Sequence, residues 1–570
     1  MAAIGIDFGT TNCVVAIFEG DNVSTIRIGE PPLEWGELGH DLLFPSVFGL
    51  DEKSKPLFGW DAKLLPPKQK IEAIKRFFFA EEHAIVGNES FTLNEISTYL
   101  FAQLRKSAAQ ESGVHFDKSV VTIPANSRGN ARKRTKICAG MANIKVLALI
   151  NEPTAAAMAA TKGHTENVMV VDWGGGTLDV TVLETRNNRF MERTSAGVST
   201  LGGVDFDTAI MGWLSDTVED LKSYSQAEKG FLRLEAERAK ILLSSEDEVS
   251  IRLPRGDSIR FTRLKFEELI QPLLQQAREP VERCLQDIAE TNLASHIDSL
   301  VLVGGTSKIP AVRNFIAEVV QLPLSPVANP MTATAEGAAV ASAILQGEMP
   351  EYNFQVTTQH ALGVLAVSHL EAKPHFSTII PRNQGLPARG TERFAPVVDH
   401  QEWLNLAIME GDPTKPPDDL GSVELQHWRV PITSPKPMND CIFDITYRYD
   451  TDGIVHVDAS DPLNQTSLLA AKVPEDDRQE KRKLVEISDN ARSTVHDESL
   501  EKSDTVPHPE LPPYLAADII MLRTKVAPFL DMEESAKLLT LCDRIVETQG
   551  ADDVLVQALH NFRDKYSYLI

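Results

Sequence analysis

Two stretches of this sequence place an aspartate directly before a glycine-rich turn. The first runs Ile-Gly-Ile-Asp-Phe-Gly-Thr-Thr-Asn and contains Asp7, and the second runs Val-Val-Asp-Trp-Gly-Gly-Gly-Thr-Leu-Asp and contains Asp172. Because glycine has no Cβ atom, the backbone N–H groups of such turns can close on an anion. An aspartate at the entry of the turn can hold Mg²⁺ through its water ligands. The combination predicts a site for the phosphate tail of a nucleotide.

The two stretches also match each other position by position. Asp7 aligns with Asp172 and Gly9 with Gly174, and the two threonines after Gly9 fall opposite glycines. Each stretch has the apolar residues of a strand on both sides of its turn. This internal repeat predicts two related halves that grip one polyphosphate from opposite sides.

A third glycine pair, Gly304-Gly305, follows the apolar run 300–303. Any single Gly-Gly pair is more simply explained as a tight β-turn. Three such turns after apolar strands, two of them with the same aspartate, favour a binding role instead. The sequence contains neither a G-x-x-x-x-G-K-[ST] loop nor a G-x-G-x-x-G fingerprint, so a P-loop or Rossmann site is not expected.

Length and composition indicate a large protein with several domains. The 570 residues are 42% hydrophobic, which suits about three or four domains. The net charge of −25 argues against a nucleic-acid partner, because a protein that binds nucleic acid needs a basic surface. The N-terminal residues lead directly into a strand and no apolar run reaches membrane-spanning length, so we expect a cytoplasmic protein without membrane contact. The five cysteines lack Cys-x-x-Cys spacing and are expected to be reduced.

The order of apolar runs predicts where the domains lie. Residues 1–346 alternate strand and helix patterns and are expected to form an α/β domain. A change of composition at 347–357 predicts a linker, and the alternating apolar residues of 358–473 predict an antiparallel β-sandwich. Residues 474–515 are charged and poor in apolar residues, which predicts partial disorder. Residues 516–570 show helical spacing and are expected to form a short helical bundle.

A helix predicted over residues 230–245 carries polar residues on one face. Glu237, Lys240 and Ser244 are spaced i, i+3 and i+7, so they share that face. One interpretation is an ion pair at the protein surface. The other is a set of donors and acceptors that meets the hydroxyl groups of a ribose. Periodicity alone does not decide between these two interpretations.

Together these motifs resemble those of the seventy-kilodalton heat-shock chaperones of the DnaK type. Besides the two aspartate turns, the sequence contains Gly-Gly-Val-Asp-Phe-Asp from Gly202, Ile-Asn-Glu-Pro-Thr-Ala-Ala-Ala from Ile150 and Val-Leu-Val-Gly-Gly-Thr-Ser-Lys-Ile-Pro from Val301. The resemblance is specific from residue 4 to about 345 and weaker to about 473. It implies an actin-like ATPase domain of duplicated ribonuclease H-like halves, followed by an antiparallel β-sandwich and a short helical lid.

The resemblance implies a molecular chaperone that hydrolyses ATP to ADP and phosphate and thereby changes the polypeptide affinity of its β-sandwich. The implied partners are unfolded or extended polypeptides and co-chaperones. The implied ligands are ATP or ADP and Mg²⁺, with K⁺ as an optional second ion near Asp179. The active-site residues that match the family motifs are the catalytic Lys75, Glu152, Asp172 and Thr177 and the metal-site residues Asp7, Asp172 and Asp179.

The family motifs also imply contacts with the nucleotide and with the second domain. Pro124 and Arg132 match a switch that relays the nucleotide state between domains. Val397, Trp403 and Leu404 fall near the peptide cleft, with a place in the sandwich core as the alternative for Trp403. The implied nucleotide-binding residues are Gly9, Thr10, Thr11, Asn12, Gly174, Gly175, Gly176, Thr177, Gly202, Gly203, Glu237, Lys240, Ser244, Gly304, Gly305, Thr306 and Lys308.

Several positions depart from the family pattern. Ile241 and Lys308 stand where arginines of the family stack on adenine, which predicts weaker or less selective nucleotide binding. Ala148 replaces an arginine that meets the J-domain of a co-chaperone, and linker residues 351–355 lack the usual leucines. A standard J-domain contact is therefore not expected. The segment after Lys75 is shortened, as in the divergent HscC-like branch.

Two other functions are compatible with the same motifs. A sugar or acetate kinase of the actin-like fold would use the same phosphate turns but would leave the β-sandwich unexplained. A nucleotide-gated adaptor that binds ATP without hydrolysing it would explain the altered adenine pocket and linker. Hydrolysis without an acceptor sugar would exclude the kinase, and an intact protein that does not hydrolyse ATP would indicate the adaptor.

Overall fold

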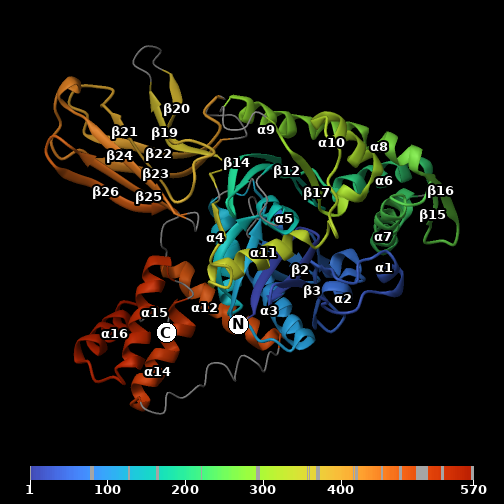
Figure 1. Cartoon of the computed structure of the whole chain (residues 1–570), viewed down its shortest axis with the longest axis horizontal. Coiled ribbons are helices and arrows are strands. Elements are labelled where there is room, and N and C mark those ends of the chain that lie inside the picture. The colour runs from blue at the N-terminus through green and yellow to red at the C-terminus, as the bar shows by residue number, and fades with distance from the viewer. Residues whose placement is uncertain are drawn as a thin grey trace.

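Two α/β lobes, a β-sandwich and a set of C-terminal helices make up the chain in the computed structural model (Figure 1). The blue and cyan first lobe and the green second lobe lie side by side, and the orange sandwich adjoins them. The structure describes the whole chain apart from residues 1, 78–82, 126, 128, 162–165, 220, 291–295, 356, 359, 368–372, 415, 417–421, 451–453, 474–477, 496–510, 528–529, 531 and 567–570.

The first lobe is built on a sheet with the hairpin of Asp7 at its centre. Its strands, in order, are β11 (Lys145–Asn151), β10 (Lys118–Ile123), β1 (Ala3–Phe8), β2 (Asn12–Glu19) and β3 (Asn22–Ile26), with β4 (Phe44–Pro45) beside β2. β1 and β2 are antiparallel, whereas β10 runs parallel to β1 and β11 parallel to β10. Most residues of β1 and β10 are buried, as their nearly continuous apolar sequences predict.

The second lobe repeats this arrangement around the hairpin of Asp172. Its strands, in order, are β17 (Ser299–Val303), β12 (Glu166–Trp173), β13 (Leu178–Arg186), β14 (Arg189–Val198) and β18 (Asn353–Gln355). β12 and β13 are antiparallel, and β17 runs parallel to β12. The strand that carries the aspartate therefore has the same kinds of neighbours in both lobes, as the sequence repeat predicts.

Two helices rich in small residues, α5 (Glu152–Thr161) and α11 (Ala333–Leu345), join the sheets. α11 lies against α5 and against β1, and α5 lies against β12 and β13. Their backbones approach closely, since a Cβ atom on Gly337 would fall 1.6 Å from the carbonyl oxygen of Ala155. Only glycine can occupy such a position without displacing the backbone.

Local sequence signals set the ends of the surrounding helices. α3 (Leu93–Ser112) begins with a capping box between Thr92 and Glu95 and ends at Gly113, whose φ of 70° is left-handed. The other helices of the two lobes are α1 (Leu33–Glu37), α2 (Gly59–Lys63), α4 (Gly129–Met141), α6 (Gly203–Thr217), α7 (Gln226–Leu242), α8 (Arg263–Gln276), α9 (Arg278–Glu290) and α10 (Pro310–Val320). Short strands complete the lobes: β5 (Phe48–Leu50), β6 (Pro56–Phe58), β7 (Lys70–Ile71), β8 (His83–Val86), β9 (Glu89–Thr92), β15 (Glu248–Arg252) and β16 (Ser258–Thr262).

The sandwich consists of two antiparallel sheets. One has the order β20 (Pro374–Ile380), β19 (Ala361–Val367), β22 (Trp403–Gly411) and β23 (Val423–Pro431), and the other β21 (Ala388–Phe394), β24 (Phe443–Tyr449), β25 (Val455–Asp461) and β26 (Thr466–Val473). Alternate residues of β24, including Phe443 and Tyr447, are buried between the sheets. The two-residue period of the sequence predicts this alternation.

Helix α12 (Arg478–Val495) lies in the region where the sequence predicts partial disorder. It contacts the first lobe, because Ser488 donates a hydrogen bond of 2.8 Å to the carbonyl of Met141 and Lys106 donates one of 2.7 Å to the carbonyl of Val495. The prediction of disorder is therefore wrong for this helix, whose docking buries its apolar residues against α3 and α4. Residues 474–477 and 496–510 of that segment lie outside the described residues.

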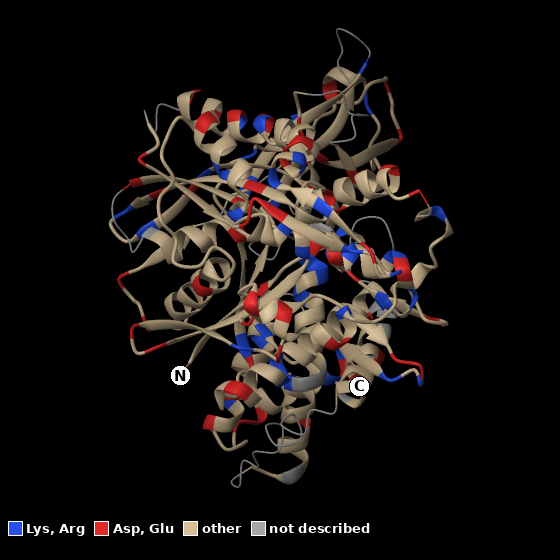
Figure 2. Ribbon diagram, turned by 90° about the vertical axis from the view of Figure 1, so that its right-hand side faces the viewer, with Lys and Arg blue, Asp and Glu red and all other residues tan. Residues whose placement is uncertain are grey.

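The C-terminal helices are α14 (Pro513–Met521), α15 (Met532–Glu547) and α16 (Asp553–Lys565). Their apolar residues, among them Leu515, Leu538 and Leu559, share one buried cluster. No helix in the described part of the chain is both long enough and apolar enough to cross a membrane. In Figure 2, lysines and arginines are interspersed with aspartates and glutamates over the elements in view.

Candidate functional site

The two aspartate turns face each other across the boundary between the lobes. An ideal Cβ atom on Gly175 would fall 1.9 Å from the hydroxyl oxygen of Thr11, and one on Gly176 would fall 2.4 Å from the methyl group of Thr10. The glycines of the second turn therefore make room for the threonines of the first. This close approach explains why the first turn has threonines at the positions where the second turn has glycines.

The first turn has an unsatisfied hydroxyl group. The Oγ1 atom of Thr11 is buried and has no hydrogen-bond partner in the part of the chain that the structure describes. Ser46, directly after β4, donates a hydrogen bond of 2.7 Å to the carbonyl of Gly9 and so fixes the turn from outside. A buried hydroxyl without a partner lowers the stability of the fold, so the tight packing of the two turns is retained at a cost.

Acidic side chains gather behind the turns. Asp172 and Asp179 occupy opposite positions of the β12–β13 hairpin, and both are buried. Thr122 donates a hydrogen bond of 2.7 Å to Asp7. The ammonium group of Lys75, from a short 3₁₀ helix at 74–77, lies 3.0 Å from the carboxylate of Glu152 at the start of α5.

Burial and mutual repulsion alter the titration of this cluster. Burial, together with the charge of Glu152, raises the pKa of Asp7 to about 7, although Lys75 opposes this shift. Burial raises the pKa of Asp172 well above its ordinary value, and the nearby Glu152 and Asp7 add to the effect. Burial and repulsion therefore disfavour the charged forms of both aspartates, and a cation bound between them would offset that repulsion.

The donor set fits Mg²⁺ held through water. Among the described residues, no three His, Cys, Asp or Glu side chains converge closely enough to ligate a metal directly. Mg²⁺ keeps several of its waters and is bound by few carboxylates together with substrate phosphates. The buried aspartates Asp7 and Asp172 provide such carboxylates on the two sides of the cleft.

Arg76 bridges the two lobes next to Lys75. Its guanidinium group lies 3.2 and 2.6 Å from the carboxylate oxygens of Asp205 and donates a hydrogen bond of 2.8 Å to the carbonyl of Gly176. Arg76 is not among the site residues that the sequence predicts. The sequence signal that could have pointed to Arg76 is its position directly after Lys75, which matches the catalytic lysine of the family.

The other glycine motifs support the second turn. The N–H groups of Gly203 and Val204, at the start of α6, donate hydrogen bonds of 3.1 and 2.9 Å to the carbonyls of Gly174 and Gly175. A Cβ atom on Gly202 would also clash with Gly175 at 2.6 Å. These contacts fix the shape of the turn.

The third glycine turn reaches the same place from β17. Thr306 donates a hydrogen bond of 2.8 Å to the carbonyl of Gly174. Gly304 has a φ of 82°, and a Cβ atom there would fall 2.4 Å from the carbonyl oxygen of Trp173. Gly305, between these two residues, is exposed. The structure thus brings all three predicted glycine turns together.

The polar face of α7 forms ion pairs. Glu237 lies 2.8 Å from Lys63 of α2 in the first lobe, and Lys240 lies 2.8 Å from Asp207 of α6. Although burial opposes it, Lys63 keeps the pKa of Glu237 below its ordinary value. The helix predicted over 230–245 is too long at its C-terminal end, because α7 ends at Leu242 and Ser244 lies in the following turn.

An aromatic cluster from the first lobe lies beside these pairs. The helix α1 of the first lobe buries Trp35. The ring of Trp35 is stacked against that of His40 at 5.6 Å, and Trp60 lies 5.6 Å from Trp35. The ammonium group of Lys63 lies 4.8 Å from the centre of the Trp35 ring. Only the tertiary structure places this cluster at the cleft.

Arg132 begins a chain of hydrogen bonds that leads to the sandwich. Arg132 donates a hydrogen bond of 2.6 Å to Asn151, and Asn151 donates one of 2.9 Å to Glu192 on β14. Thr357, just before the sandwich, donates a hydrogen bond of 3.2 Å to the same Glu192. Pro124, directly after β10, is buried. The part of the predicted linker at 353–355 forms β18, which pairs with β14.

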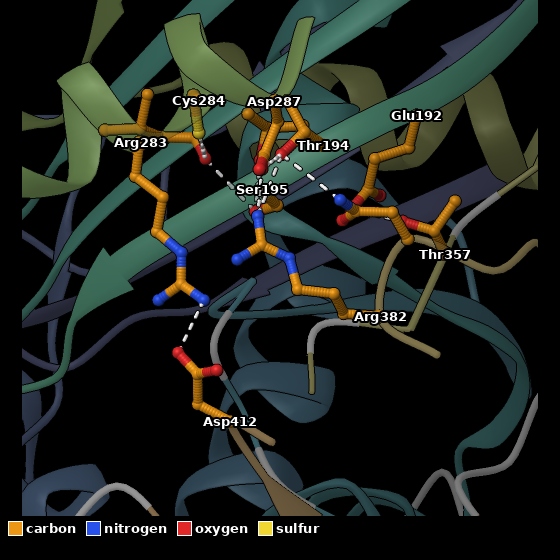
Figure 3. Close-up of polar contacts among 12 residues, drawn as sticks. Glu192, Thr194, Ser195, Arg283, Cys284, Asp287, Thr357, Arg382 and Asp412 are labelled. Carbon is orange, nitrogen blue, oxygen red and sulfur yellow. Dashed lines mark hydrogen bonds and ion pairs between the residues drawn. The ribbon is translucent and has the colours of Figure 1, made fainter. Parts of the chain in front are cut away.

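A second contact between the lobes and the sandwich is shown in Figure 3. Arg382, after β20, forms an ion pair with Asp287 of α9, which also accepts a hydrogen bond from Thr194. Arg283 of α9 lies 2.9 Å from Asp412, after β22. Two arginine–aspartate pairs of opposite orientation therefore hold the sandwich against the second lobe.

The residues predicted at the peptide cleft lie at one end of the sandwich. Leu404 is half-buried and packs on the sandwich core, whereas Val397 is exposed in the connection before β22. Trp403 is 37% exposed, and the guanidinium group of Arg429 lies 4.5 Å from its ring centre. The alternative that places Trp403 in the core is therefore wrong, because neighbouring residues of a strand point to opposite faces.

Comparison with known proteins reveals extensive similarity. A family model described as Hsp70 protein matches residues 73–507, more than half of the chain. The chain is 30% identical over 533 residues to the chaperone protein DnaK of Methanothermobacter thermautotrophicus, covering 86% of this chain and 87% of that protein. It is 33% identical over 503 residues to DnaK of Thermus thermophilus, covering 80% of this chain and 78% of that protein. It is also 33% identical over 482 residues to DnaK of Thermosipho melanesiensis, covering 80% of this chain and 78% of that protein.

Proposed function

Because the chain belongs to the Hsp70 family and is an ATP-hydrolysing chaperone, we propose that its two facing turns and the Lys75–Glu152 pair form the ATPase site. The observation that carries this proposal is the close approach of the two turns, in which Gly175 and Gly176 make room for Thr11 and Thr10, together with the buried pair of Lys75 and Glu152. The backbone N–H groups of the turns would donate hydrogen bonds to the phosphates.

Residues from both turns would hold the phosphates and the metal. Asp7 and Asp172 would bind Mg²⁺ through water, and Asp179 would serve a K⁺ ion. When bound, Mg²⁺ supplies positive charge that stabilises the charge developing on the transferred phosphoryl group. The phosphate-binding residues in this proposal are Gly9, Thr10, Thr11, Asn12, Gly174, Gly175, Gly176 and Thr177.

Lys75 and Glu152 would act directly on hydrolysis. The ammonium group of Lys75 would stabilise negative charge on the γ-phosphoryl group, and its ion pair at 3.0 Å holds it ready in the cleft. Glu152 and Asp172 would accept hydrogen bonds from the attacking water. The hydroxyl of Thr177 would help to orient this water in line with the bond that breaks.

The nucleoside would lie between α7 and the third glycine turn. Glu237, Lys240 and Ser244 would contact the ribose, while Gly304 to Lys308 would border the base. Burial lowers the pKa of Lys308, and Lys308 has no ion-pair partner among the described residues. A base acceptor group is a suitable partner for such an ammonium group. Glu237 and Lys240 already form ion pairs, so nucleotide binding would compete with these pairs.

The same proposal assigns a role to the contacts with the sandwich. The hydrogen-bond chain from Arg132 to Thr357, together with Pro124, would relay the state of the nucleotide to the second domain. Unfolded polypeptide would bind at the end of the sandwich near Val397 and Leu404. Co-chaperones would regulate the cycle, with Ala148 in place of a charged contact for a J-domain.

The test is single-turnover hydrolysis of Mg-ATP by the full chain without an acceptor sugar. Lys75→Ala should lower the rate by about 10²–10³-fold because a charge-stabilising group is lost, and Thr177→Ala should also lower it. Lys53→Ala, at an exposed lysine in a turn, is the matched control. An unchanged rate in Lys75→Ala would contradict the assigned role. An intact chain without hydrolysis would indicate the adaptor instead.

A further inference from the structure

One buried imidazole at the cleft has no role in the site as assigned. His40 is 8% exposed, and its ring nitrogens have no hydrogen-bond partner in the described part of the chain. Neither nitrogen is among the buried side-chain atoms that are sealed from solvent without a partner. The ring is therefore enclosed by protein while its polar edge stays within reach of a ligand.

Aromatic neighbours hold this ring in one orientation. Trp35 is stacked on the imidazole at 5.6 Å with an interplanar angle of 23°, and Trp60 lies at 6.5 Å with an angle of 27°. Trp60 is itself fixed, because its indole N–H donates a hydrogen bond of 2.9 Å to the carbonyl of Leu43. A ring held in this way loses little further freedom when a ligand binds.

The cluster that carries His40 lies against the second lobe. Glu34 of α1 forms two hydrogen bonds with Arg252 of β15, at 3.1 and 2.9 Å. A Cβ atom on Gly230 of α7 would fall 2.6 Å from the ring of Pro67. The charged groups that act electrostatically on His40 are Glu237, Lys63, Lys308 and Lys240, three of which belong to the proposed nucleoside site.

The chemistry of the ring suits a nucleoside. Burial lowers the pKa of His40 to about 4, so at neutral pH the imidazole is uncharged and has one N–H donor and one acceptor nitrogen. The ribose and the purine base both carry groups that complement such an edge. Because this edge is open while the ring is held in place, it can exchange water for a hydrogen bond to a ligand at little entropic cost.

We propose that His40, a residue of the first lobe, contacts the nucleoside: its imidazole forms a hydrogen bond to the bound adenine nucleotide, opposite Lys308. This inference rests on the proposed ATPase site. It adds a specificity residue at the position where the chain has Ile241 and Lys308, neither of which can stack as a planar cation. The rigid ring on Trp35 would fix the nucleoside by a directional contact.

The experiment is titration calorimetry of the full chain with Mg-ADP and, separately, with Mg-pyrophosphate. His40→Phe keeps the stacked ring but removes both nitrogens, and it should weaken ADP binding by about threefold to tenfold. His40→Gln restores a donor and an acceptor and should recover part of this loss. Binding of pyrophosphate should not change, since it has no nucleoside. His427→Phe, at an exposed histidine of β23, is the matched control.

The possible results separate this inference from the proposed function. Equal ADP affinity in His40→Phe and the unaltered chain would overturn the inference alone. An equal loss for ADP and pyrophosphate would also overturn it, because it would indicate a distorted cleft. If the unaltered chain does not bind Mg-ADP, the proposed ATPase site fails and the inference fails with it. Should His40→Phe not fold, His40→Leu replaces it, with the same loss expected for ADP alone and the same results contradicting the inference.

Discussion

Lys75 and Glu152 form a charged pair inside the cleft, where such a pair adds little to stability. The loss of water around two buried charges offsets most of their attraction. Their value is better explained by chemistry, because an ammonium group that is already fixed in the cleft needs no rearrangement when charge develops on a phosphoryl group. Arg76, the next residue, contacts Asp205 and Gly176 instead. In the proposed site, Lys75 would therefore serve hydrolysis while its neighbour Arg76 joins the two lobes.

His40 should make the nucleotide-free protein sensitive to acid. Its pKa in the folded state, about 4, lies below the ordinary value of 6.5, so the unfolded chain binds the proton more readily. Stability is therefore lost as the pH falls below about 6.5, by on the order of 2 kcal/mol between pH 7 and 5 for this one group. His40→Phe should lose less thermal stability over that interval than the unaltered chain. An equal loss in both proteins would show that folding does not lower the pKa of His40.

The crossing of α5 and α11 determines how the two lobes meet. Both helices consist mainly of small residues, and their backbones come into direct contact at Gly337. α11 also lies on β1, where a Cβ atom on Gly5 would fall 2.1 Å from the backbone nitrogen of Ala339. Interiors this closely packed do not accommodate an extra methyl group without a shift of the backbone.

Gly337→Ala should destabilise the two-lobed domain. The added methyl group would meet the carbonyl of Ala155, and the loss of stability should be roughly 1–3 kcal/mol or more. Gly212→Ala, in the middle of α6 where nothing lies within 4 Å of the added atom, is the matched control. It should raise stability by about 0.5–1 kcal/mol because alanine favours helices. Thermal unfolding of both variants measures the difference, and equal midpoints would contradict it.

For the whole molecule, the contacts between the lobes and the sandwich offer a route for coupling. β18 adds a strand from the predicted linker to the second sheet, and Glu192 accepts hydrogen bonds from both Asn151 and Thr357. The ion pair of Arg382 with Asp287 lies beside Thr194 of β14 (Figure 3). These contacts would therefore transmit a movement of the lobes directly to the sandwich.

Arg382→Ala should weaken the coupling between polypeptide and ATP hydrolysis. When the guanidinium group of Arg382 is removed, Asp287 of α9 loses its ion pair with the sandwich. We expect the ratio of hydrolysis rates with and without an extended peptide to move towards one. Arg393→Ala is the control, since that arginine pairs with Asp444 within the sandwich and is exposed. If Arg382→Ala leaves the ratio at its original value, this contact does not carry the coupling.

The sequence by itself determined the features that depend on local chemistry. The repeat of Asp7 and Asp172, with glycines after each, predicts two equivalent hairpins because strands and tight turns follow from patterns a few residues long. The alternation around Phe443 predicts the sandwich in the same way. For the residue roles at the site, sequence motifs provide predictions that the measurements above can test.

Only the tertiary structure decided which distant residues meet. Ser244 falls outside α7, which ends at Leu242, because hydrophobic periodicity does not mark the residue at which a helix ends. The helix α12 forms in a charged segment because docking on the first lobe buries its few apolar residues. His40 reaches the cleft through its stacking on Trp35, a contact between aromatic rings that sequence spacing does not specify. Local patterns select elements, whereas burial and close contact between remote segments select their neighbours.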